Sequence, residues 1–332
     1  MQILEKIKEK SFLVLGRAGI DLYADPVGTA AETAEMFRAD LGGSSANICV
    51  GLSKLGCQSA LVTSVSDDSV GRFCINRLRH YGVDTHYIKT KGGEYRTSLA
   101  VYESRLEDFQ LCLYRNNAVD FQVDHQDVEA VDYDAFCSLI TAGTVFAGEP
   151  SRASTFHAFD LAKEAGLPII FDIDYRPYSW PSPQVASDIL IRAGMASDMI
   201  VGNDEEFGFM AGDYDRGLDQ ARRLADQGKL VIYKKGHNGA ITFVDGKEIH
   251  TGIYPVTAIK PNGAGDSFLA GLLASIAHGC TLEQAILRGS ACASIVVSHP
   301  GCAPAMPDTA TLNAFITSHP CLLYTSPSPR DS

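Results

Sequence analysis

The chain has 332 residues, of which 45% are hydrophobic and 20% are charged, and its formal net charge is −12. This composition is typical of a globular protein large enough to bury a sizeable core in one or two domains. The negative charge argues against nucleic acid or an anionic membrane as the main partner, because both repel an acidic surface.

The cysteines and the N-terminus indicate a cellular compartment. The nine cysteines are scattered, and no two of them form a Cys-x-x-Cys pair. Buried thiols in a reducing compartment are therefore favoured over a disulfide framework or a zinc site. The apolar run at 12–15 is too short for a signal sequence or a membrane span. We expect a cytoplasmic protein.

Short apolar runs, typical of buried strands, alternate with stretches of helical periodicity. In chain order, the predicted elements are a strand at 12–15, a helix at 44–55, a strand at 60–63, a helix at 70–80, and apolar strands at 138–146, 168–173, 199–201 and 230–233. Continuous apolar strands with helices between them predict an α/β fold, in which a mostly parallel sheet is covered on both faces.

Two segments break this alternation. Residues 109–115 have the alternating pattern of a half-exposed strand, and residues 97–103 could pair with them across a turn at 104–108. Residues 17–41 are irregular. A small β-rich piece on an α/β body is often a lid over a site, but the pattern leaves an edge hairpin of the main sheet equally open.

The last third of the chain has further clear signals. Residues 240–244 and 247–251, joined by Asp245-Gly246, form a predicted hairpin. A helix is predicted from Thr281, which has the capping-box spacing to Gln284. Residues 322–332 are rich in Ser and Pro without any pattern, and we expect a disordered or foreign tail.

The segment 260–267, Lys-Pro-Asn-Gly-Ala-Gly-Asp-Ser, carries the strongest chemical signal. A glycine-rich turn that opens a helix leaves backbone N–H groups unpaired, and these groups and the helix dipole attract anions. Asp266 in the same turn could accept a proton from a hydroxyl. An anion site beside a base is what phosphoryl transfer to an alcohol requires. A turn with an aspartate N-cap is the structural alternative.

Two earlier segments suit a polyhydroxylated ligand. Gly42 and Gly43 precede a predicted helix whose first turn contains Asn47. Small residues let a ligand approach the backbone, and Asn47 can both donate and accept hydrogen bonds. Asp21 follows the first strand, at the edge where open α/β sheets bind ligands. For each segment alone, a capped loop or a solvated acid is the commoner case.

Three other motifs follow predicted strands. Arg176 in the segment 172–176 could bind a carboxylate or phosphate with both arms of its guanidinium. The acids and amide in 203–206 suit Mg²⁺. The two glycines in 235–239 could let backbone pass over a nucleotide. A surface salt bridge, acids that complement a helix dipole and an ordinary turn are the respective alternatives. The sequence contains no Walker loop and no His-Glu-x-x-His or Gly-x-Ser-x-Gly motif.

The order of these motifs is more specific than any one of them. An early strand followed by Asp21, then Gly-Gly-x-x-x-Asn, Asn-x-x-Glu, Gly-x-x-Gly and a late Gly-Ala-Gly-Asp, resembles the ribokinase-like (PfkB) carbohydrate kinases over residues 10–318. The resemblance implies a three-layer α/β/α domain with a mostly parallel sheet, a small β-rich lid from about 17–41 and 96–120, and a tail at 319–332. It also implies phosphorylation of a sugar hydroxyl with ATP and Mg²⁺.

The resemblance implies roles for the residues that match the family's motifs. Asp266 becomes the base, and the N–H groups of Gly263, Ala264 and Gly265 become the anion hole for the moving phosphoryl group. The residues implied to hold the sugar are Asp21, Gly43 and Asn47. Those implied to organise Mg²⁺ and the phosphates are Asn203 and Glu206, and those implied to bind the nucleotide are Lys235, Gly236, Gly239 and Asn262.

One departure from the family pattern narrows the substrate. Lys260, Pro261 and Asn262 replace the usual acidic residue and two threonine-like residues before Gly-Ala-Gly-Asp. This variant, the segment 17–23 and the segment 107–118 resemble the members that phosphorylate 5-dehydro-2-deoxygluconate in inositol breakdown. An acid sugar needs cationic partners, and the candidates are Arg17, Arg96, Arg115 and Arg176, of which Arg115 and Arg176 are assigned to the substrate. The departure leaves open how the adenine side and a monovalent cation site are built.

The leading hypothesis is an ATP-dependent kinase acting on the 6-hydroxyl of 5-dehydro-2-deoxy-D-gluconate. A fructokinase or a 2-dehydro-3-deoxygluconokinase is the alternative within this class, and a non-catalytic sugar- or nucleotide-binding sensor is the alternative outside it. Asp266 argues against the sensor, because a sensor needs no base. The lid strands are expected to close on the sugar or to pair between subunits, so a homodimer through the lid is a further expectation.

Overall fold

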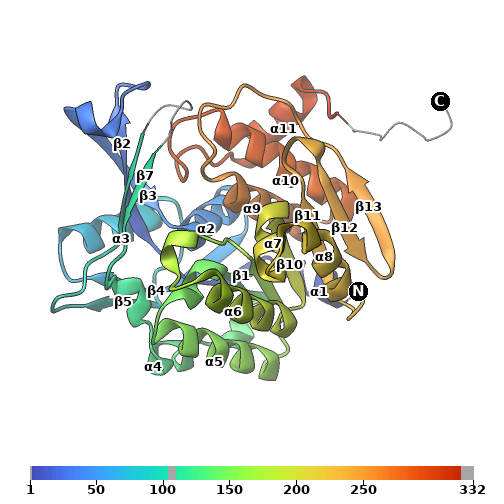
Figure 1. The fold of residues 1–332 in the computed structure, drawn as a ribbon, viewed down its shortest axis with the longest axis horizontal. Helices are drawn as coiled ribbons and strands as arrows, with labels where there is room; N and C mark the ends of the chain where they lie inside the picture. The colour runs from blue at the N-terminus through green and yellow to red at the C-terminus, as the bar shows by residue number, and fades with distance from the viewer. Residues whose placement is uncertain (1, 104–109, 323–332) are drawn as a thin grey trace.

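The computed structural model describes residues 2–103 and 110–322, which form two sheets and the helices around them (Figure 1). The predicted turn at 104–108 and the predicted tail beyond 322 lie outside the described residues. Leu322, where the predicted tail begins, pairs with Ile253 through two backbone hydrogen bonds of 2.9 and 3.1 Å.

The large sheet has nine strands within the described residues, and it is mostly parallel as predicted. Only its last two strands, which form the predicted hairpin, run antiparallel to their neighbours. In order across the sheet, the strands are β13 (Lys247–Thr251), β12 (Ala240–Val244), β11 (Leu230–Lys234), β10 (Met199–Asn203), β9 (Ile169–Asp172), β8 (Ser138–Ala142), β1 (Ser11–Leu15), β4 (Gln58–Ser66) and β5 (Ile88–Lys91).

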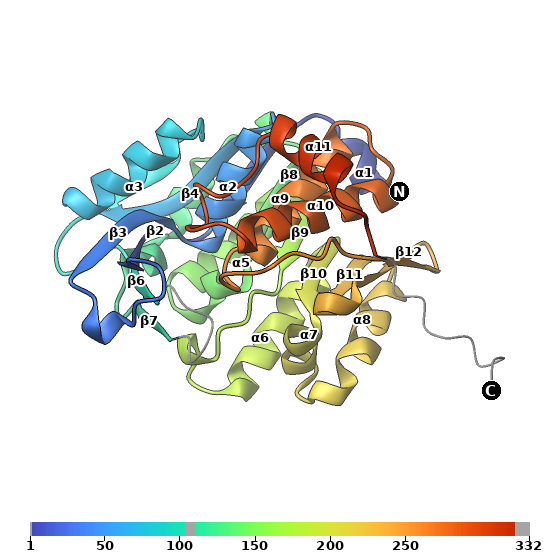
Figure 2. The ribbon, with the colours of Figure 1, turned by 90° about the horizontal axis from the view of Figure 1, so that it is seen from above.

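Helices cover both faces of this sheet, which confirms the predicted three-layer α/β/α fold (Figure 2). One layer contains α1 (Gln2–Ile7), α2 (Ser44–Lys54), α3 (Ser69–His80), α9 (Ala264–Ala277), α10 (Leu282–Val297) and α11 (Thr309–Ser318). The other contains α4 (His125–Glu129), α5 (Ser151–Glu164), α6 (Pro183–Ala196), α7 (Asp204–Ala211) and α8 (Gly217–Ala225). In β1, Phe12 and Val14 join the first core while Leu13 and Leu15 join the second. The strand is therefore apolar throughout, because both of its faces are buried.

The apolar run at 138–146 is only partly a strand. The strand β8 ends at Ala142, and Gly143–Ala147 form a 3₁₀ turn. A side chain at Gly143 could not be accommodated, because its Cβ would lie 2.0 Å from the carbonyl oxygen of Ile173. Val145 and Phe146 remain buried after the turn, so hydrophobicity alone does not mark where the strand ends.

A small second sheet stands apart from the large one, at the left of Figure 1. Its strands, in order across the sheet, are β3 (Met36–Gly42), β2 (Gly19–Asp25), β6 (Leu99–Tyr102) and β7 (Leu111–Tyr114). The pairing of β6 with β7 is antiparallel as predicted, but the edge-hairpin alternative is wrong, because these strands pair with β2 and not with the large sheet. Residues 17–41, which are irregular in sequence, contain β2 and all of β3 except its last residue, Gly42.

The strand β2 begins at Gly19, directly after β1 ends at Leu15, so a strand of the large sheet continues into the small sheet. On one face of the small sheet, the rings of Tyr23 and Tyr102 stack with their centroids 5.0 Å apart. The strands β1, β9, β10 and β11 run parallel, so their carboxyl ends share one edge of the large sheet. The motifs that follow these strands are thereby brought to one side of the molecule.

Two further expectations concern the whole chain. Within the described ranges, no helix is long and apolar enough to cross a membrane. All nine cysteines lie in these ranges as free thiols, and the buried ones confirm the prediction of buried thiols. They are Cys49, Cys57, Cys74, Cys137, Cys292 and Cys302.

Candidate active site

The N-terminus of α9 has the geometry of an anion site. Gly263 precedes the helix in the left-handed conformation, with φ of 82° and ψ of −2°, and no side chain caps the helix. A Cβ at Gly263 would lie 3.0 Å from Cys302 Sγ and from Val296 Cγ1, so a larger residue would be strained and crowded. The first N–H groups of α9, from Ala264 and Gly265, are thus left to meet a ligand.

Asp266 lies in the first turn of α9 and contacts α2. Asn47 Nδ2 donates a hydrogen bond of 2.8 Å to Asp266 Oδ2. Burial and the charge of Asp174 raise the pKa of Asp266 to about 7, although Asn47 opposes the shift. The other amide atom, Asn47 Oδ1, is buried without a hydrogen-bond partner among the described residues. The pair therefore offers two groups to a ligand. The Asp266 carboxylate has a pKa near neutral pH, and the Asn47 side-chain carbonyl can accept a hydrogen bond.

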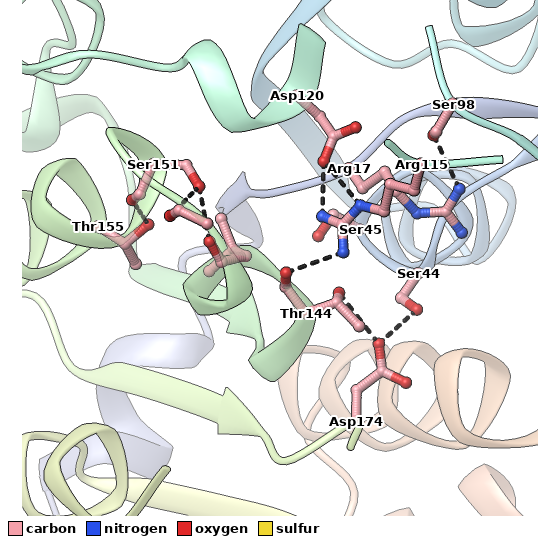
Figure 3. Close-up of polar contacts among 12 residues, drawn as sticks. Arg17, Ser44, Ser45, Ser98, Arg115, Asp120, Thr144, Ser151, Thr155 and Asp174 are labelled. Carbon is pink, nitrogen blue, oxygen red and sulfur yellow. Dashed lines mark hydrogen bonds and ion pairs between the residues drawn. The ribbon is translucent and has the colours of Figure 1, made fainter. Parts of the chain in front are cut away.

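Asp174 is a second buried carboxylate, and its neighbours hold it in the ionised form (Figure 3). Ser44 Oγ and Thr144 Oγ1 donate hydrogen bonds of 2.7 and 3.3 Å to Asp174 Oδ2. Arg176 Nη2 lies 2.7 Å from Asp174 Oδ1. Burial alone would raise the pKa of Asp174, but Arg176 and these hydroxyls keep it below its usual value. Asp174 therefore remains charged while its field favours protonation of Asp266.

Two arginines lie between the small sheet and Asp174 (Figure 3). The Arg115 guanidinium donates to Asp120 Oδ2 through Nε at 3.1 Å and Nη2 at 2.5 Å, and to the Thr144 carbonyl through Nη1 at 3.0 Å. Arg17 Nη1 donates to Ser98 Oγ at 3.0 Å. Arg115 is thus committed to a buried ion pair, whereas Arg17 has only a hydroxyl partner among the described residues.

The side chain of Asp21 projects from β2 across β3. A Cβ at Gly42 would lie 1.9 Å from Asp21 Oδ1, so the glycine provides the space that this carboxylate occupies. Burial raises the pKa of Asp21 to about 6, although Arg17 and Tyr23 oppose the shift. Tyr23 donates a 3.3 Å hydrogen bond to Oδ2, whereas Oδ1 is buried without a partner among the described residues. An oxygen left in this state fits a ligand hydroxyl.

The adjoining glycine, Gly43, has φ of 100°. A Cβ at Gly43 would lie 2.4 Å from the carbonyl oxygen of Arg17, which also accepts a 3.2 Å bond from Ala46 N. Gly43 therefore lets the start of α2 approach the connection between β1 and β2.

A cation and a third carboxylate lie on the other side of α9. A Cβ at Gly265 would lie 3.6 Å from Lys234 Nζ and 3.9 Å from Asp172 Oδ2, so both groups face the first turn of the helix. Burial raises the pKa of Asp172 to about 8, with Lys234 opposing the shift and Glu206 adding to it. An ammonium group next to the positive end of a helix dipole is unfavourable unless an anion lies between them.

The residues predicted to organise Mg²⁺, Asn203 and Glu206, lie at the start of α7. Asn203 Oδ1 accepts a 2.8 Å bond from Glu206 N, and Glu206 Oε2 accepts a 2.8 Å bond from Asn203 N. This is a capping box, so the spacing also has the structural role that the sequence left open. In the described residues, no group of three or more His, Cys, Asp or Glu side chains is placed to hold a metal ion. Glu206 and Asp172 would suit an Mg²⁺ ion that takes its other ligands from phosphates and water.

The remaining residues that the sequence predicts to bind the nucleotide lie in two turns. After β11, Lys235 N donates a 2.7 Å bond to the Gly239 carbonyl, and Gly236 and Gly239 have φ of 54° and 79°. Gly239 is required by the turn, because a Cβ there would lie 2.0 Å from the Thr251 carbonyl oxygen. Before α9, the Asn262 carbonyl accepts a 2.8 Å bond from Lys260 Nζ, and Asn262 Nδ2 is buried without a partner among the described residues.

The structure brings Asn47, Asp266, Lys234 and Asp172 together at the first turn of α9. Asp21 and Gly43 lie where β2, β3 and the start of α2 approach one another. The predicted residues Asn203, Glu206, Lys235, Gly236 and Gly239 lie at the ends of β10 and β11. The sequence interpretation missed Asp172, Asp174, Lys234, Ser44 and Thr144. A signal was present for the first two, because Asp172 ends β9 and Asp174 lies two residues beyond it, which places both at the carboxyl edge of the sheet.

Comparison with known proteins decides the family. The family model described as "pfkB family carbohydrate kinase" matches residues 9–309 of this chain. The chain belongs to this family. The predicted family and enzyme class are confirmed, and the chain is a PfkB carbohydrate kinase.

Relatives of this PfkB kinase share nearly its whole length. The 5-dehydro-2-deoxygluconokinase of Geobacillus kaustophilus (strain HTA426) is 36% identical over 320 residues, which cover 94% of this chain and 95% of the relative. A double-mutant fructokinase from Vibrio cholerae O395, solved with fructose, ADP and a potassium ion, has a TM-score of 0.80 at 25% identity, covering 92% of this chain and 98% of the other. The fold also matches the fructokinase with bound ATP from Xylella fastidiosa, with a TM-score of 0.82 at 21% identity over 93% and 98% of the two chains.

The raised pKa of Asp266 predicts a pH-dependent stability difference. The folded state binds a proton at Asp266 up to a pH of about 7, whereas the unfolded chain releases it near the ordinary value. The stability that Asp266 contributes is therefore present at low pH and is lost as the pH rises through 7. We expect the Asp266→Asn variant of this PfkB kinase to gain stability over the wild type from pH 5 to pH 8, measured by urea unfolding without ligands. Asp188→Asn, on the exposed side of α6, is the control for loss of one negative charge. A difference that does not grow with pH would contradict the prediction.

Proposed function

We propose that this PfkB kinase transfers the γ-phosphoryl group of ATP to the 6-hydroxyl of 5-dehydro-2-deoxy-D-gluconate, a step of myo-inositol catabolism. The observation that carries the chemistry is the Asp266 carboxylate, held by Asn47 beside the uncapped N-terminus of α9. The choice of sugar is supported by the 36% identity with the Geobacillus kaustophilus enzyme over 94% of this chain.

Asp266 is the base in this proposal. As the sugar oxygen forms a bond to the γ-phosphorus, its proton passes to the Asp266 carboxylate, and the bond from the γ-phosphorus to the oxygen of the departing ADP breaks. A base is most effective when its pKa lies near the working pH, and that of Asp266 is about 7. Asn47 keeps one carboxylate oxygen engaged, which leaves the other to face the hydroxyl.

The anion hole consists of the N–H groups of Gly263, Ala264 and Gly265. Charge develops on the oxygens of the moving phosphoryl group, and donors fixed in place before the reaction stabilise it by about 3–4 kcal/mol each. The left-handed conformation of Gly263 supports this assignment, because it turns the chain so that the helix begins with its N–H groups uncapped.

The sugar is assigned to the edge where β2 meets α2. Asp21 and Asn47 each have a buried oxygen without a partner in the described residues, and such oxygens suit sugar hydroxyls. Gly43 stays assigned to the sugar through its backbone, because the Arg17 carbonyl fills the space where a side chain at Gly43 would lie. Arg115 and Arg176 stay assigned to the substrate side, since a guanidinium has five N–H donors and their ion pairs do not use all of them.

The nucleotide is assigned to the ends of β10 and β11. Lys235, Gly236, Gly239 and Asn262 would contact the nucleotide, and Asn203 and Glu206 would organise Mg²⁺ together with Asp172. When bound, Mg²⁺ neutralises charge on the phosphate oxygens. Lys234 faces the same first turn of α9, and we assign it to the transferred phosphate. A monovalent cation is included because the Vibrio cholerae fructokinase was solved with a potassium ion.

The central experiment measures ADP formation with three sugars side by side: 5-dehydro-2-deoxygluconate, 2-dehydro-3-deoxygluconate and D-fructose. We expect the first to give the highest kcat/KM. Asp266→Asn should lower kcat by about 1000-fold or more while ATP and sugar still bind, as calorimetry would show. Comparable kcat/KM on fructose would overturn the acid-sugar assignment, and an Asp266→Asn variant as active as the wild type would overturn the mechanism.

A second prediction concerns Lys234. Lys234→Met should lower kcat/KM for ATP about 100-fold, the range seen when one fixed donor to a developing charge is lost. Lys229→Met is the matched control, because Lys229 precedes the same strand at its opposite end and binds the carbonyls of Met195 and Ser197. Steady-state kinetics with varied ATP separate the two. A value for Lys234→Met within about threefold of the wild type would remove Lys234 from the phosphate site.

A third prediction concerns the small sheet as a paired lid. One face of this sheet packs Tyr23 against Tyr102, whereas Phe37 and Tyr114 are 40% and 62% exposed. We propose that a second copy of the chain covers these exposed residues, and that the sheet closes over the sugar. Light scattering after size exclusion should give a dimer at micromolar concentration, and Tyr114→Glu should shift it toward monomer. Tyr214→Glu, at a residue 58% exposed in the 3₁₀ turn after α7, should not. A wild-type monomer would exclude the pairing.

A further inference from the structure

Arg17 differs from the neighbouring arginines in having no carboxylate ion-pair partner among the described residues. Arg115 is paired with Asp120, and Arg176 is paired with Asp174. Within the described ranges, no carboxylate oxygen lies within ion-pair distance of Arg17, whose hydrogen bond to Ser98 Oγ is to a neutral group. Asp21 is the carboxylate whose charge acts most strongly on Arg17, and with Asp120 and Asp174 it raises the pKa of the guanidinium despite burial. None of these carboxylates meets the guanidinium at ion-pair distance, so its N–H fork stays open to a ligand.

The surroundings of Arg17 form a built site. A Cβ at Gly19 would lie 2.9 Å from Arg17 Nη1 and 2.8 Å from Ser98 Oγ, so the guanidinium occupies space that only a glycine leaves open. The backbone is equally constrained, because the Arg17 carbonyl accepts a bond from Ala46 N at the start of α2. Side chain and backbone are thus both held in one position, between the large sheet and the small one.

Arg17 faces the sugar side of the candidate site. Its charge acts on Asp21, Asp174 and Asp266, which places the guanidinium among the carboxylates around the sugar site. Asp21 and Asp266 are the groups that would meet hydroxyls, and a carboxylate would be repelled by both. The guanidinium is the complementary group, since its planar fork can donate two parallel hydrogen bonds to a carboxylate.

Three other cations that form no ion pair with the described residues are less well placed than Arg17 to bind a ligand carboxylate. Arg96 donates through Nη1 to the carbonyls of Gly93 and Tyr95, is exposed, and lines a separate cavity with Asp68 and Tyr114. Lys260 is buried and donates to the Asn262 carbonyl. Lys234 faces the phosphate side of α9.

We propose that Arg17 binds the carboxylate of the acid sugar and so determines selectivity for acid over neutral sugars. The inference rests on the proposed function, because it takes the substrate to carry a carboxylate at the end remote from the reacting hydroxyl. Arg17 is a binding residue in this assignment and takes no part in proton transfer.

The test compares 5-dehydro-2-deoxygluconate with its neutral primary amide, which has the same shape without the charge. For the wild type we expect kcat/KM to be higher for the acid than for the amide. Arg17→Gln should lower kcat/KM for the acid about 100-fold, mainly through KM, the effect of losing a hydrogen-bonded charge partner. Its value for the amide should change by less than about threefold. Arg96→Gln is the matched control, and its acid-to-amide ratio should equal that of the wild type.

Each outcome separates this inference from the proposed function. If the wild type prefers the acid and Arg17→Gln keeps the preference, Arg17 is not the carboxylate ligand and the proposed function stands. An equal loss on acid and amide would show a structural role and would also overturn the inference. A wild type that treats acid and amide alike would overturn both. Should Arg17→Gln fail to fold, as judged by its melting curve, Arg17→Lys decides, since it keeps the charge but loses the fork and should raise KM for the acid alone.

Discussion

The hydrogen bond from Asn47 to Asp266 is the interaction on which the candidate site depends. It joins residues 219 positions apart in the sequence, one from the helix beside the small sheet and one from the helix that begins with the glycine turn. Without this bond, the Asp266 side chain could adopt other orientations, because two further carboxylates and a lysine lie close to the first turn of α9. Because Asn47 occupies one oxygen, the position of the carboxylate relative to the anion site is set before any ligand binds.

The carboxylates around this bond differ in how well the protein stabilises their ionised form. Asp174 is stabilised in its ionised form by Arg176 and two hydroxyls, whereas Asp21, Asp172 and Asp266 all have pKa values raised by burial. Such a cluster is unfavourable in the empty protein, since several carboxylates share a buried region. Perturbed carboxylates of this kind are typical of functional sites, and in the proposed function bound hydroxyl and phosphate groups would relieve part of this cost.

The sequence indicated which edge of the sheet the candidate site residues occupy, but it did not indicate their hydrogen-bond and ion-pair partners. Asp21 comes after β1, Asn203 ends β10 and the turn before β12 follows β11. Parallel pairing gathers the ends of these strands at one edge of the large sheet, so the alternation of elements places the three motifs on the same side of the molecule. The ion pair of Arg115 with Asp120 does not, because the 3₁₀ turn that brings them together has no periodicity to reveal it. Asn203 and Glu206 show a second limit. A spacing of three residues fits a capping box and a metal site equally well, and the capping box between them is seen only in the structure.

The direct continuation of β1 into β2 has a mechanical consequence. Three residues, Gly16 to Ala18, separate a strand in the middle of the large sheet from a strand in the middle of the small one. The small sheet is therefore joined to the large one at this point by a short connection, and any rotation it undergoes must bend the chain within residues 16–18. Tyr23, whose hydroxyl lies 3.4 Å from Cys302 Sγ, adds a second point of attachment next to the turn that opens α9. The small sheet is in this way attached both to the large sheet and to the turn before α9, so a displacement of one is transmitted to the other.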